Sequence, residues 1–310
     1  MSMVLIAPTR DTSVWVKGLK AIDPELEIYT HPEVPEEAKA GIRCAVTWLH
    51  PKGSLGEFPN LELVCSMGAG VDHLIDDPDI APETPMTRIV DPALAWSMSN
   101  FCLTALLNYH RQWQHFVEQQ ADKRWAQKDE CELELRVGVL GLGFLGQDLA
   151  QKVAQLGFYV AGYSQSPKEV DGVESFAGPD QLDDFLGKVN ALVCLLPLTD
   201  DTESFLNKAF FARCQPGTYL INVARGSHLV EDDLIPALEA GHLSGAVLDV
   251  FRKEPLPADH AFWSDSRITV TPHHASLTNP QAAIPQIMEN YQRMVQGEPL
   301  KNEVDKGKGY

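Results

Sequence analysis

The chain has 310 residues, among them 25 Lys and Arg against 43 Asp and Glu, so its formal net charge is −18. Its length suggests two domains or one large one. Its 44% hydrophobic and 22% charged residues are typical of a globular protein with a full core. The negative charge argues against nucleic acid or an anionic membrane as a partner, since both attract proteins with a surplus of Lys and Arg.

The amino terminus and the cysteines both favour the cytoplasm. The segment 1–7 has no basic region and continues into a strand-like run, unlike a signal peptide. No apolar run reaches the ~20 residues that span a membrane. The six cysteines are scattered without a Cys-x-x-Cys pair, which disfavours a disulfide framework and a zinc site. We therefore expect a cytoplasmic protein with reduced thiols and no metal centre.

Short apolar runs alternate with polar, helix-compatible stretches over the first part of the chain. The runs are Val4–Ala7, Cys44–Leu49, Leu61–Ser66 and Thr87–Val90. This rhythm predicts a small parallel α/β sheet. Asp91-Pro92 then favours a helix start, with Asp as the N-cap and Pro at the first helical position. We predict a helix from Pro92 to about Gln120, followed by a polar linker.

Longer apolar runs begin after Arg136. The expected strands are Val137–Leu140, Phe158–Tyr163, Ala191–Leu196, Tyr219–Val223, Ala246–Val250 and Ile268–Thr271. Helical stretches such as Glu231–Ala240 separate them, and fully apolar strands need cover on both faces, so the pattern predicts a doubly wound parallel sheet. The tail Pro280–Gln296 has helical spacing. It is too short to form a domain, so we expect it to pack on a domain formed by the rest of the chain.

A glycine-rich loop, Gly141-x-Gly143-x-x-Gly146, follows the first of these strands and opens a helix. Gly141 allows a tight turn, Gly143 lets the backbone approach a pyrophosphate, and Gly146 lets the helix pack close to the strand. The helix N-terminus offers N–H groups to phosphates. A ligand-free turn is the alternative, but the strand–loop–helix context favours a dinucleotide site.

The end of the next strand favours NADP over NAD. NAD-binding proteins usually place an Asp or Glu there for the ribose hydroxyls, about 20 residues after the glycine loop. This chain has Ser164, followed by Gln165, Ser166 and Lys168. A 2′-phosphate is then not repelled, and hydroxyl and ammonium groups can bind it. NAD stays open as the alternative cofactor.

Polar residues follow three of the later strands. Arg225 comes after one buried strand, Asp249 and Glu254 near the end of the next, and His273 after the third. Ligands of open α/β sheets bind at the carboxyl ends of the strands, so these residues should converge where the glycine loop holds a cofactor. Each alone could be a surface or structural residue, but together they indicate a catalytic set.

Four motifs carry a resemblance to a known family. They are Met67-Gly-Ala-Gly-Val-Asp72, Asn222-Val-Ala-Arg-Gly226, Asp249-Val-Phe-x-x-Glu-Pro255 and Thr271-Pro-His273. With these motifs in this order, the whole chain resembles the D-isomer-specific 2-hydroxyacid dehydrogenases. Within that family it is most similar to glyoxylate/hydroxypyruvate reductase A, on segments such as Ser175-Phe-Ala-Gly178.

The resemblance implies a catalytic triad of Arg225, Glu254 and His273. Arginine offers a fixed, always charged fork of donors for the substrate carboxylate and carbonyl oxygen. Histidine can protonate the developing alkoxide near neutral pH, and the glutamate can hold the imidazole and favour its protonated form. The nicotinamide supplies the hydride. Asp249 is implied to support the nicotinamide ribose or to orient its neighbours.

Binding roles are implied as well. The backbone amides of Gly68, Ala69 and Gly70 would bind the substrate carboxylate, and Trp48 would limit the pocket to small acids. The implied cofactor residues are those of the two segments already described together with Phe144, Leu145, Leu196, Pro197, Val223, Ala224, Arg225, Asp249 and His273. No metal ligand is expected.

The family fold has a doubly wound Rossmann domain and a smaller, flavodoxin-like α/β substrate domain. We expect residues 1–99 and 277–310 to form the discontinuous substrate domain and residues 100–276 the dinucleotide-binding domain. The implied reaction is reduction of glyoxylate to glycolate and of hydroxypyruvate to D-glycerate, in a homodimer. Alternatives are a reductase of another short 2-keto acid, such as phenylpyruvate, and a non-catalytic dinucleotide-sensing protein.

Overall fold

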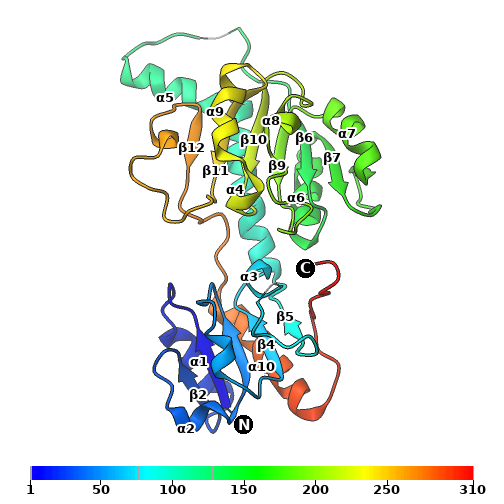
Figure 1. The fold of residues 1–310 in the computed structure, drawn as a ribbon. Coiled ribbons are helices and arrows are strands. Elements are labelled where there is room, and N and C mark those ends of the chain that lie inside the picture. The colour runs from blue at the N-terminus through cyan, green and yellow to red at the C-terminus, as the bar shows by residue number, and fades with distance from the viewer. Residues whose placement is uncertain (1, 76, 128, 310) are drawn as a thin grey trace. The chain divides into compact units, whose positions relative to one another are not determined.

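The computed structural model describes residues 2–75, 77–127 and 129–309, which form two compact units. Unit 1 comprises Met1–Ala93 and Thr278–Tyr310, and unit 2 comprises Leu94–Leu277. The two ends of the chain, blue and red in Figure 1, therefore belong to one unit. The first division lies earlier than residue 99 because side chains of the first long helix, such as Met98, pack in the core of unit 2.

A five-stranded parallel sheet with the order β2-β1-β3-β4-β5 forms the centre of unit 1. Its strands are β1 (Ser2–Ile6), β2 (Glu27–Thr30), β3 (Ile42–Thr47), β4 (Leu63–Ser66) and β5 (Met86–Thr87). This order is that of flavodoxin-like sheets, as the family resemblance implies.

Helices from both ends of the chain cover the sheet of unit 1. They are α1 (Ser13–Ile22), α2 (Glu36–Lys39), α3 (Asp72–Ile75) and α10 (Pro280–Gln296), with a 3-10 turn at Leu55–Glu57. The tail helix α10 begins and ends at the predicted residues. It packs on α1 so closely that a Cβ atom on Gly18 would lie 2.4 Å from Cδ1 of Ile284.

Seven parallel strands form the sheet of unit 2, in the order β12-β11-β10-β9-β6-β7-β8. They are β6 (Arg136–Leu140), β7 (Tyr159–Ser164), β8 (Glu174–Ala177), β9 (Ala191–Cys194), β10 (Thr218–Asn222), β11 (Leu243–Leu248) and β12 (Ile268–Val270).

Helices cover both faces of this second sheet (Figure 1). They are α4 (Pro92–His110), α6 (Phe144–Gln155), α7 (Leu182–Lys188), α8 (Lys208–Phe211) and α9 (Glu231–Glu239), with 3-10 turns at Pro179–Gln181, Gly226–His228 and Ala261–Trp263. The short helix α5 (Trp113–Ala121) follows α4 and buries only Gln119 among its residues. Leu220 and Ile221, neighbours on β10, belong to different core clusters, since successive side chains of a strand point to opposite faces. The predicted doubly wound α/β fold is confirmed.

The predicted helix from Pro92 to Gln120 is interrupted in the structure. Asp91 accepts a hydrogen bond from the amide of Ala93 (3.0 Å) at its start, as an N-cap does. At its end the amide of Leu133 donates to the carbonyl of His110 (2.9 Å). Gln112 then adopts a left-handed backbone (φ 53°) before α5 begins. The returning segment therefore takes the carbonyl that a continuous helix would use.

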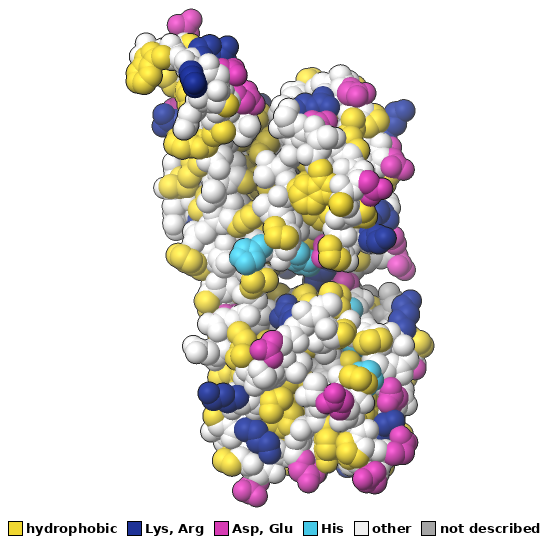
Figure 2. All heavy atoms as spheres, turned by 90° about the vertical axis from the view of Figure 1, so that its left-hand side faces the viewer, with side chains coloured by type: hydrophobic (Ala, Val, Ile, Leu, Met, Phe, Trp, Pro, Cys, Tyr) yellow, Lys and Arg dark blue, Asp and Glu magenta, His cyan; other side chains and the backbone are white. Residues whose placement is uncertain are grey.

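Exposed aromatic side chains mark α5 and the loop after it. Trp113 and Phe116 lie largely on the surface, and Trp125 is 97% exposed. Figure 2 shows hydrophobic side chains, in yellow, at the top of the view where this segment lies. Exposed aromatic patches usually mark contact surfaces. No helix among the described residues is long and apolar enough to cross a membrane.

Candidate active site

Five strands of unit 2 end at the same level of the sheet. Parallel pairing places Cys194 opposite both Leu140 and Asn222. Leu248 in turn lies opposite Asn222 and Val270. The loops that follow these strands carry the glycine motif and the predicted catalytic residues, and they therefore leave the sheet at one edge.

His273 and Glu254 are hydrogen-bonded to each other at this edge. Nδ1 of His273 lies 2.8 Å from Oε2 of Glu254, and the backbone amide of Phe251 donates to Oε1 (3.0 Å). About a third of each side chain is exposed, 33% for the histidine and 34% for the glutamate. Nε2 of the imidazole has no bond to any residue that the structure describes, which leaves that nitrogen to act on a substrate.

The glutamate is held in its charged form. Burial raises the pKa of Glu254, but the hydrogen bonds from His273 and the Phe251 amide, with the charges of His273 and Arg225, together lower that pKa below its ordinary value. The carboxyl is therefore ionised at neutral pH. An ionised carboxylate can only accept, so the Nδ1 proton stays between the two residues and Nε2 carries any second proton.

A buried carboxylate shapes the turn that carries His273. Asp249 is 1% exposed and accepts hydrogen bonds from Oγ1 of Thr271 (2.6 Å) and from the backbone amides of His274 and Ala275 (both 2.8 Å). Its carbonyl accepts from the amide of His273 (2.8 Å). His273 has φ 53°, a left-handed conformation that costs a non-glycine residue about 1–3 kcal/mol. Asp249 thus positions the catalytic candidate.

The backbone of Arg225 is fixed by two polar side chains that the sequence did not single out. Nδ2 of Asn222 donates to the carbonyl of Arg225 (3.1 Å), and the Arg225 amide donates to Nδ1 of the buried His228 (3.2 Å). Nη1 of Arg225 donates to the carbonyl of Ala224 (2.7 Å). Asn222 is the last residue of an otherwise apolar strand. A polar side chain at that position could have indicated its role from the sequence.

Gly226 lets the Arg225 loop approach the Glu254 loop. A Cβ atom on Gly226 would lie 1.9 Å from the carbonyl carbon of Phe251, far inside van der Waals contact. Phe251 is also the residue whose amide holds Glu254. The absence of a side chain at position 226 therefore lets the loops of Arg225 and Glu254 lie against each other.

The glycine loop fits a pyrophosphate. Gly141 has φ 100°, and a Cβ atom on it would lie 2.6 Å from the carbonyl oxygen of Leu195. A Cβ atom on Gly146 would lie 1.8 Å from the Gly141 carbonyl oxygen, whereas one on Gly143 would meet nothing within 4 Å. Open space therefore adjoins the N-cap of α6, whose first turn has no acidic residue. Such a helix end attracts phosphate.

The predicted NADP segment lies at the end of β7. Ser164 is buried and its hydroxyl donates to the carbonyl of Ser166 (2.7 Å), so it orders the turn. Gln165, Ser166 and Lys168 are exposed. The remaining cofactor candidates follow strands at the same edge: Phe144, Leu145, Leu196, Pro197, Val223 and Ala224.

The predicted substrate residues lie in unit 1, at the carboxyl ends of β3 and β4. The Gly68 amide donates to Oγ of Ser66 (3.1 Å), and that hydroxyl donates to the Gly70 carbonyl (2.9 Å). Since the Gly68 amide is used within the loop, the amides of Ala69 and Gly70 remain for a carboxylate. Trp48 packs so tightly that a Cβ atom on Gly68 would lie 2.4 Å from its Cζ3 atom.

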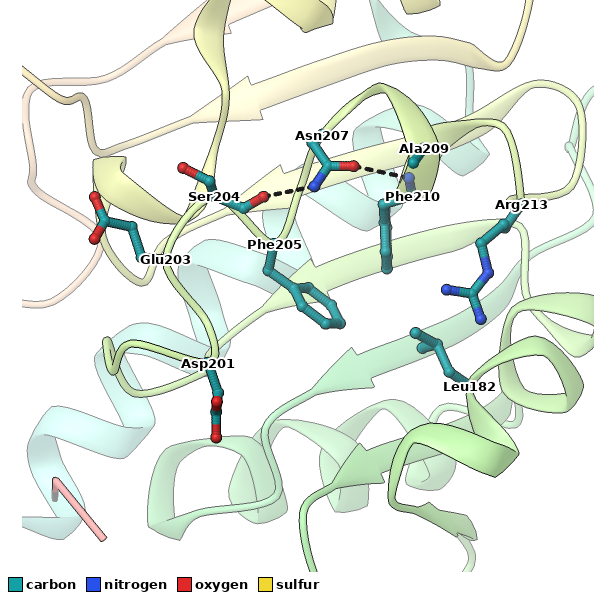
Figure 3. A pocket seen from close by; sticks show the side chains of 9 residues that line it. All are labelled: Leu182, Asp201, Glu203, Ser204, Phe205, Asn207, Ala209, Phe210 and Arg213. Carbon is teal, nitrogen blue, oxygen red and sulfur yellow. Dashed lines mark hydrogen bonds between the residues drawn. The ribbon is translucent and has the colours of Figure 1, made fainter. Parts of the chain in front are cut away.

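A cavity of about 290 Å³ lies elsewhere in unit 2, between α7 and α8 (Figure 3). Its polar side chains serve the local fold. Asn207 accepts from the amide of Phe210 (3.1 Å) and donates to the carbonyl of Ser204 (2.7 Å), and Arg213 bonds to Asp183 (2.6 Å). None of the predicted site residues lines it. The described residues also contain no group of three metal-ligating side chains.

Comparison with known proteins decides the family. A sequence model described as D-isomer specific 2-hydroxyacid dehydrogenase, NAD binding domain, matches residues 103–275. Glyoxylate/hydroxypyruvate reductase A from Serratia proteamaculans (strain 568) is 38% identical, with 100% of both chains covered. The chain belongs to the D-isomer specific 2-hydroxyacid dehydrogenase family. The resemblance found in the motifs is thereby confirmed.

Solved structures of this 2-hydroxyacid dehydrogenase family agree in fold. An enzyme from Xanthobacter autotrophicus Py2, in complex with NADPH and MES, has a TM-score of 0.92 and 38% identity, covering 100% of this chain and 99% of that one. The NADPH-dependent glyoxylate/hydroxypyruvate reductase from Sinorhizobium meliloti, in complex with NADP and sulfate, has a TM-score of 0.92, 34% identity and the same coverage.

Substitution of Asp249 distinguishes its two implied roles. In Asp249→Asn an amide N–H₂ replaces one acceptor oxygen, so a buried backbone amide loses its partner at a cost of about 1–3 kcal/mol. We expect a lower Tm together with a lower kcat, because the turn carrying His273 loosens.

Thermal unfolding and steady-state kinetics check this prediction. Asp259→Asn, the same change at an exposed position of unit 2, is the control and should alter neither quantity. An unchanged Tm with a higher KM for the cofactor would instead assign Asp249 to the nicotinamide ribose.

Proposed function

We propose that this dehydrogenase reduces glyoxylate to glycolate and hydroxypyruvate to D-glycerate, with NADPH as its preferred hydride donor and NADH as an alternative. The observation that carries the proposal is the 2.8 Å hydrogen bond between Glu254 and His273, at the sheet edge that also bears the glycine loop. Full-length similarity to reductases of these two acids supports the substrate class. Bound NADP or NADPH in related structures supports the cofactor.

Each residue of the triad has a distinct task in this proposal. Arg225 pairs with the substrate carboxylate and polarises the keto oxygen through its fixed guanidinium. His273 donates the proton on Nε2 to the oxygen as negative charge develops there. Glu254 accepts from Nδ1, orients the ring and stabilises the imidazolium before transfer. The glycine loop would hold the pyrophosphate of the cofactor, whose nicotinamide would supply the hydride.

Unit 1 has the task of substrate recognition in the proposal. The amides of Ala69 and Gly70 bind the carboxylate, and the indole of Trp48 restricts the size of the acid. The carboxylate is shared by all 2-keto acids, so Trp48 is the group that excludes long side chains. A reductase of larger acids such as phenylpyruvate and a non-catalytic dinucleotide sensor are the competing functions.

We propose that the protein acts as a homodimer in the cytoplasm. The exposed aromatic side chains of α5 and its loop, Trp113, Phe116 and Trp125, would be covered by a second copy. All six cysteines are free thiols, which suits a reducing compartment.

Sedimentation of the full chain tests the dimer. The double substitution Trp125→Ser and Phe116→Ser should shift the mass from that of a dimer toward that of a monomer. A monomeric mass in both the unsubstituted protein and the double variant would refute the dimer.

An absorbance assay at about 340 nm, the reduced nicotinamide band, tests the function. With NADPH, glyoxylate and hydroxypyruvate should be reduced faster than phenylpyruvate. Arg225→Gln should lower kcat/KM for glyoxylate by roughly 30- to 1,000-fold, the worth of about 2–4 kcal/mol of charge-assisted binding. NADPH affinity, measured by fluorescence titration, should change little. A loss below about threefold would rule out the role of Arg225.

Cofactor choice depends on position 164 in the proposal. The unsubstituted protein should have a higher kcat/KM with NADPH than with NADH, because no carboxylate repels the 2′-phosphate. Ser164→Asp should reverse or strongly reduce this preference. Ser164→Ala, which removes the bond to Ser166 without adding charge, is the matched control. Equal efficiency with both cofactors in the unsubstituted protein contradicts the reading.

The pH dependence should report the Glu254–His273 pair. Reduction consumes a proton, so kcat/KM should be high at low pH and fall as rising pH removes the proton that is transferred. Glu254 is ionised across this range because its pKa is lowered. Glu254→Gln keeps the shape but removes the charge that stabilises the imidazolium, so the alkaline limb should move to lower pH.

Two variants complete this pH measurement. Glu239→Gln, at the exposed end of α9, should leave the profile in place. His273→Gln should abolish the limb and leave a very small rate. If the limb stays where it is in Glu254→Gln, Glu254 is not the functional partner of His273.

A further inference from the structure

Two partly buried arginines lie at the carboxyl edge of the unit 1 sheet. Arg10 follows β1 and Arg88 follows β5. Within the described part of the chain, neither guanidinium has an ion pair or a hydrogen-bonded acceptor. Burial lowers the pKa of both groups, since no anion compensates for the lost water. Arginines without an acidic partner are unexpected in a chain with a formal charge of −18, because acidic side chains outnumber basic ones.

Arg10 has a fixed neighbour. Its guanidinium carbon lies 4.0 Å from the ring centre of Trp48, a cation–π contact. The indole is supported in turn by the edge of His73 (5.6 Å between ring centres), which lies against His50 (5.7 Å). Nε2 of His50 lies 2.5 Å from Oδ2 of Asp77, and both side chains are buried. The platform beneath Arg10 is therefore anchored.

The same indole contacts the substrate loop. Trp48 carries Arg10 on its ring face and packs its Cζ3 atom against Gly68. Asp11, the acid nearest to Arg10 in the sequence, accepts a hydrogen bond from the amide of Ser13 (2.9 Å) instead of neutralising the arginine. The indole of Trp48 thus lies between the Arg10 cation and the loop to which we assign the first carboxylate.

We propose that Arg10 binds a second carboxylate of the substrate, so that this protein takes 2-keto dicarboxylates in addition to monocarboxylates. The inference rests on the proposed function, because the amides of Ala69 and Gly70 hold the first carboxylate there. The planar fork of an arginine matches a carboxylate in two-point contact. Arg88 has no described contact with Trp48, so we assign the second position to Arg10.

Hydroxypyruvate and mesoxalate form a matched pair of substrates, since mesoxalate has a carboxylate where hydroxypyruvate has a hydroxymethyl group. Mesoxalate, NADPH and a proton give tartronate and NADP⁺. We expect the kcat/KM ratio of mesoxalate to hydroxypyruvate to fall at least about tenfold in Arg10→Met, as a charge-assisted contact is lost. Arg10→Lys, which keeps the charge, should recover part of the ratio.

Arg43→Met is the matched control. Arg43 lies at the opposite end of β3 from Trp48 and pairs with Glu62, so the variant removes the same charge from unit 1 away from the carboxyl edge. It should leave the ratio unchanged. An unchanged ratio in Arg10→Met, or a fall in Arg88→Met in its place, would overturn the assignment. The proposal is also refuted if Arg10→Lys recovers none of the ratio and both Arg10→Met and Arg10→Lys lower the Tm. Arg10 would then serve to support Trp48 and not to bind a carboxylate.

Binding separates this inference from the proposed reaction. Calorimetry of the NADPH complex measures the affinities for tartronate and glycolate without turnover. Tartronate should bind more tightly than glycolate, and Arg10→Met should remove that advantage. If the protein reduces neither keto acid yet shows this dependence on Arg10, the proposed function fails and the anion site stands. Equal tartronate affinity in both proteins refutes the anion site.

Discussion

The hydrogen bonds accepted by Asp249 fix the turn after β12, and the rest of the candidate site is built on that turn. Three donors surround a carboxylate that is 1% exposed, and the same residue's carbonyl holds the amide of His273. The left-handed backbone of His273 persists because these bonds compensate for its strain. Only with the ring in that place can Nδ1 bond to Glu254 and leave Nε2 for chemistry.

Sequence reasoning located this site through polar residues at the ends of apolar strands. That signal is strong because a parallel sheet gathers such ends at one edge, and it identified Arg225, Glu254 and His273 correctly as neighbours of one edge. Their catalytic roles stay predictions. The supporting contacts could not be predicted from the sequence. Asn222 and His228 bond to the backbone carbonyl and amide of Arg225, and every residue has a carbonyl that could accept such a bond.

Two edge strands, β2 and β8, were not predicted from the sequence, whereas the edge strand β12 was. The core strands are continuous apolar runs, whereas β2 and β8 are short, mixed with polar residues and at the edge of their sheets. An edge strand needs little burial, so its composition resembles that of a loop. The end of α4 was hidden for another reason: it is set by Leu133, a residue remote in sequence whose amide takes the last carbonyl.

The packing of α10 on α1 bears on how the chain matures at the ribosome. Gly18 and Ile284 are almost at opposite ends of the polypeptide, yet their contact is part of the core of unit 1. The strands of unit 1 are therefore synthesised well before α10, which packs in the same core cluster. Unit 2 is contiguous and can fold while synthesis continues. The core of unit 1 is thus completed after that of unit 2 has been synthesised.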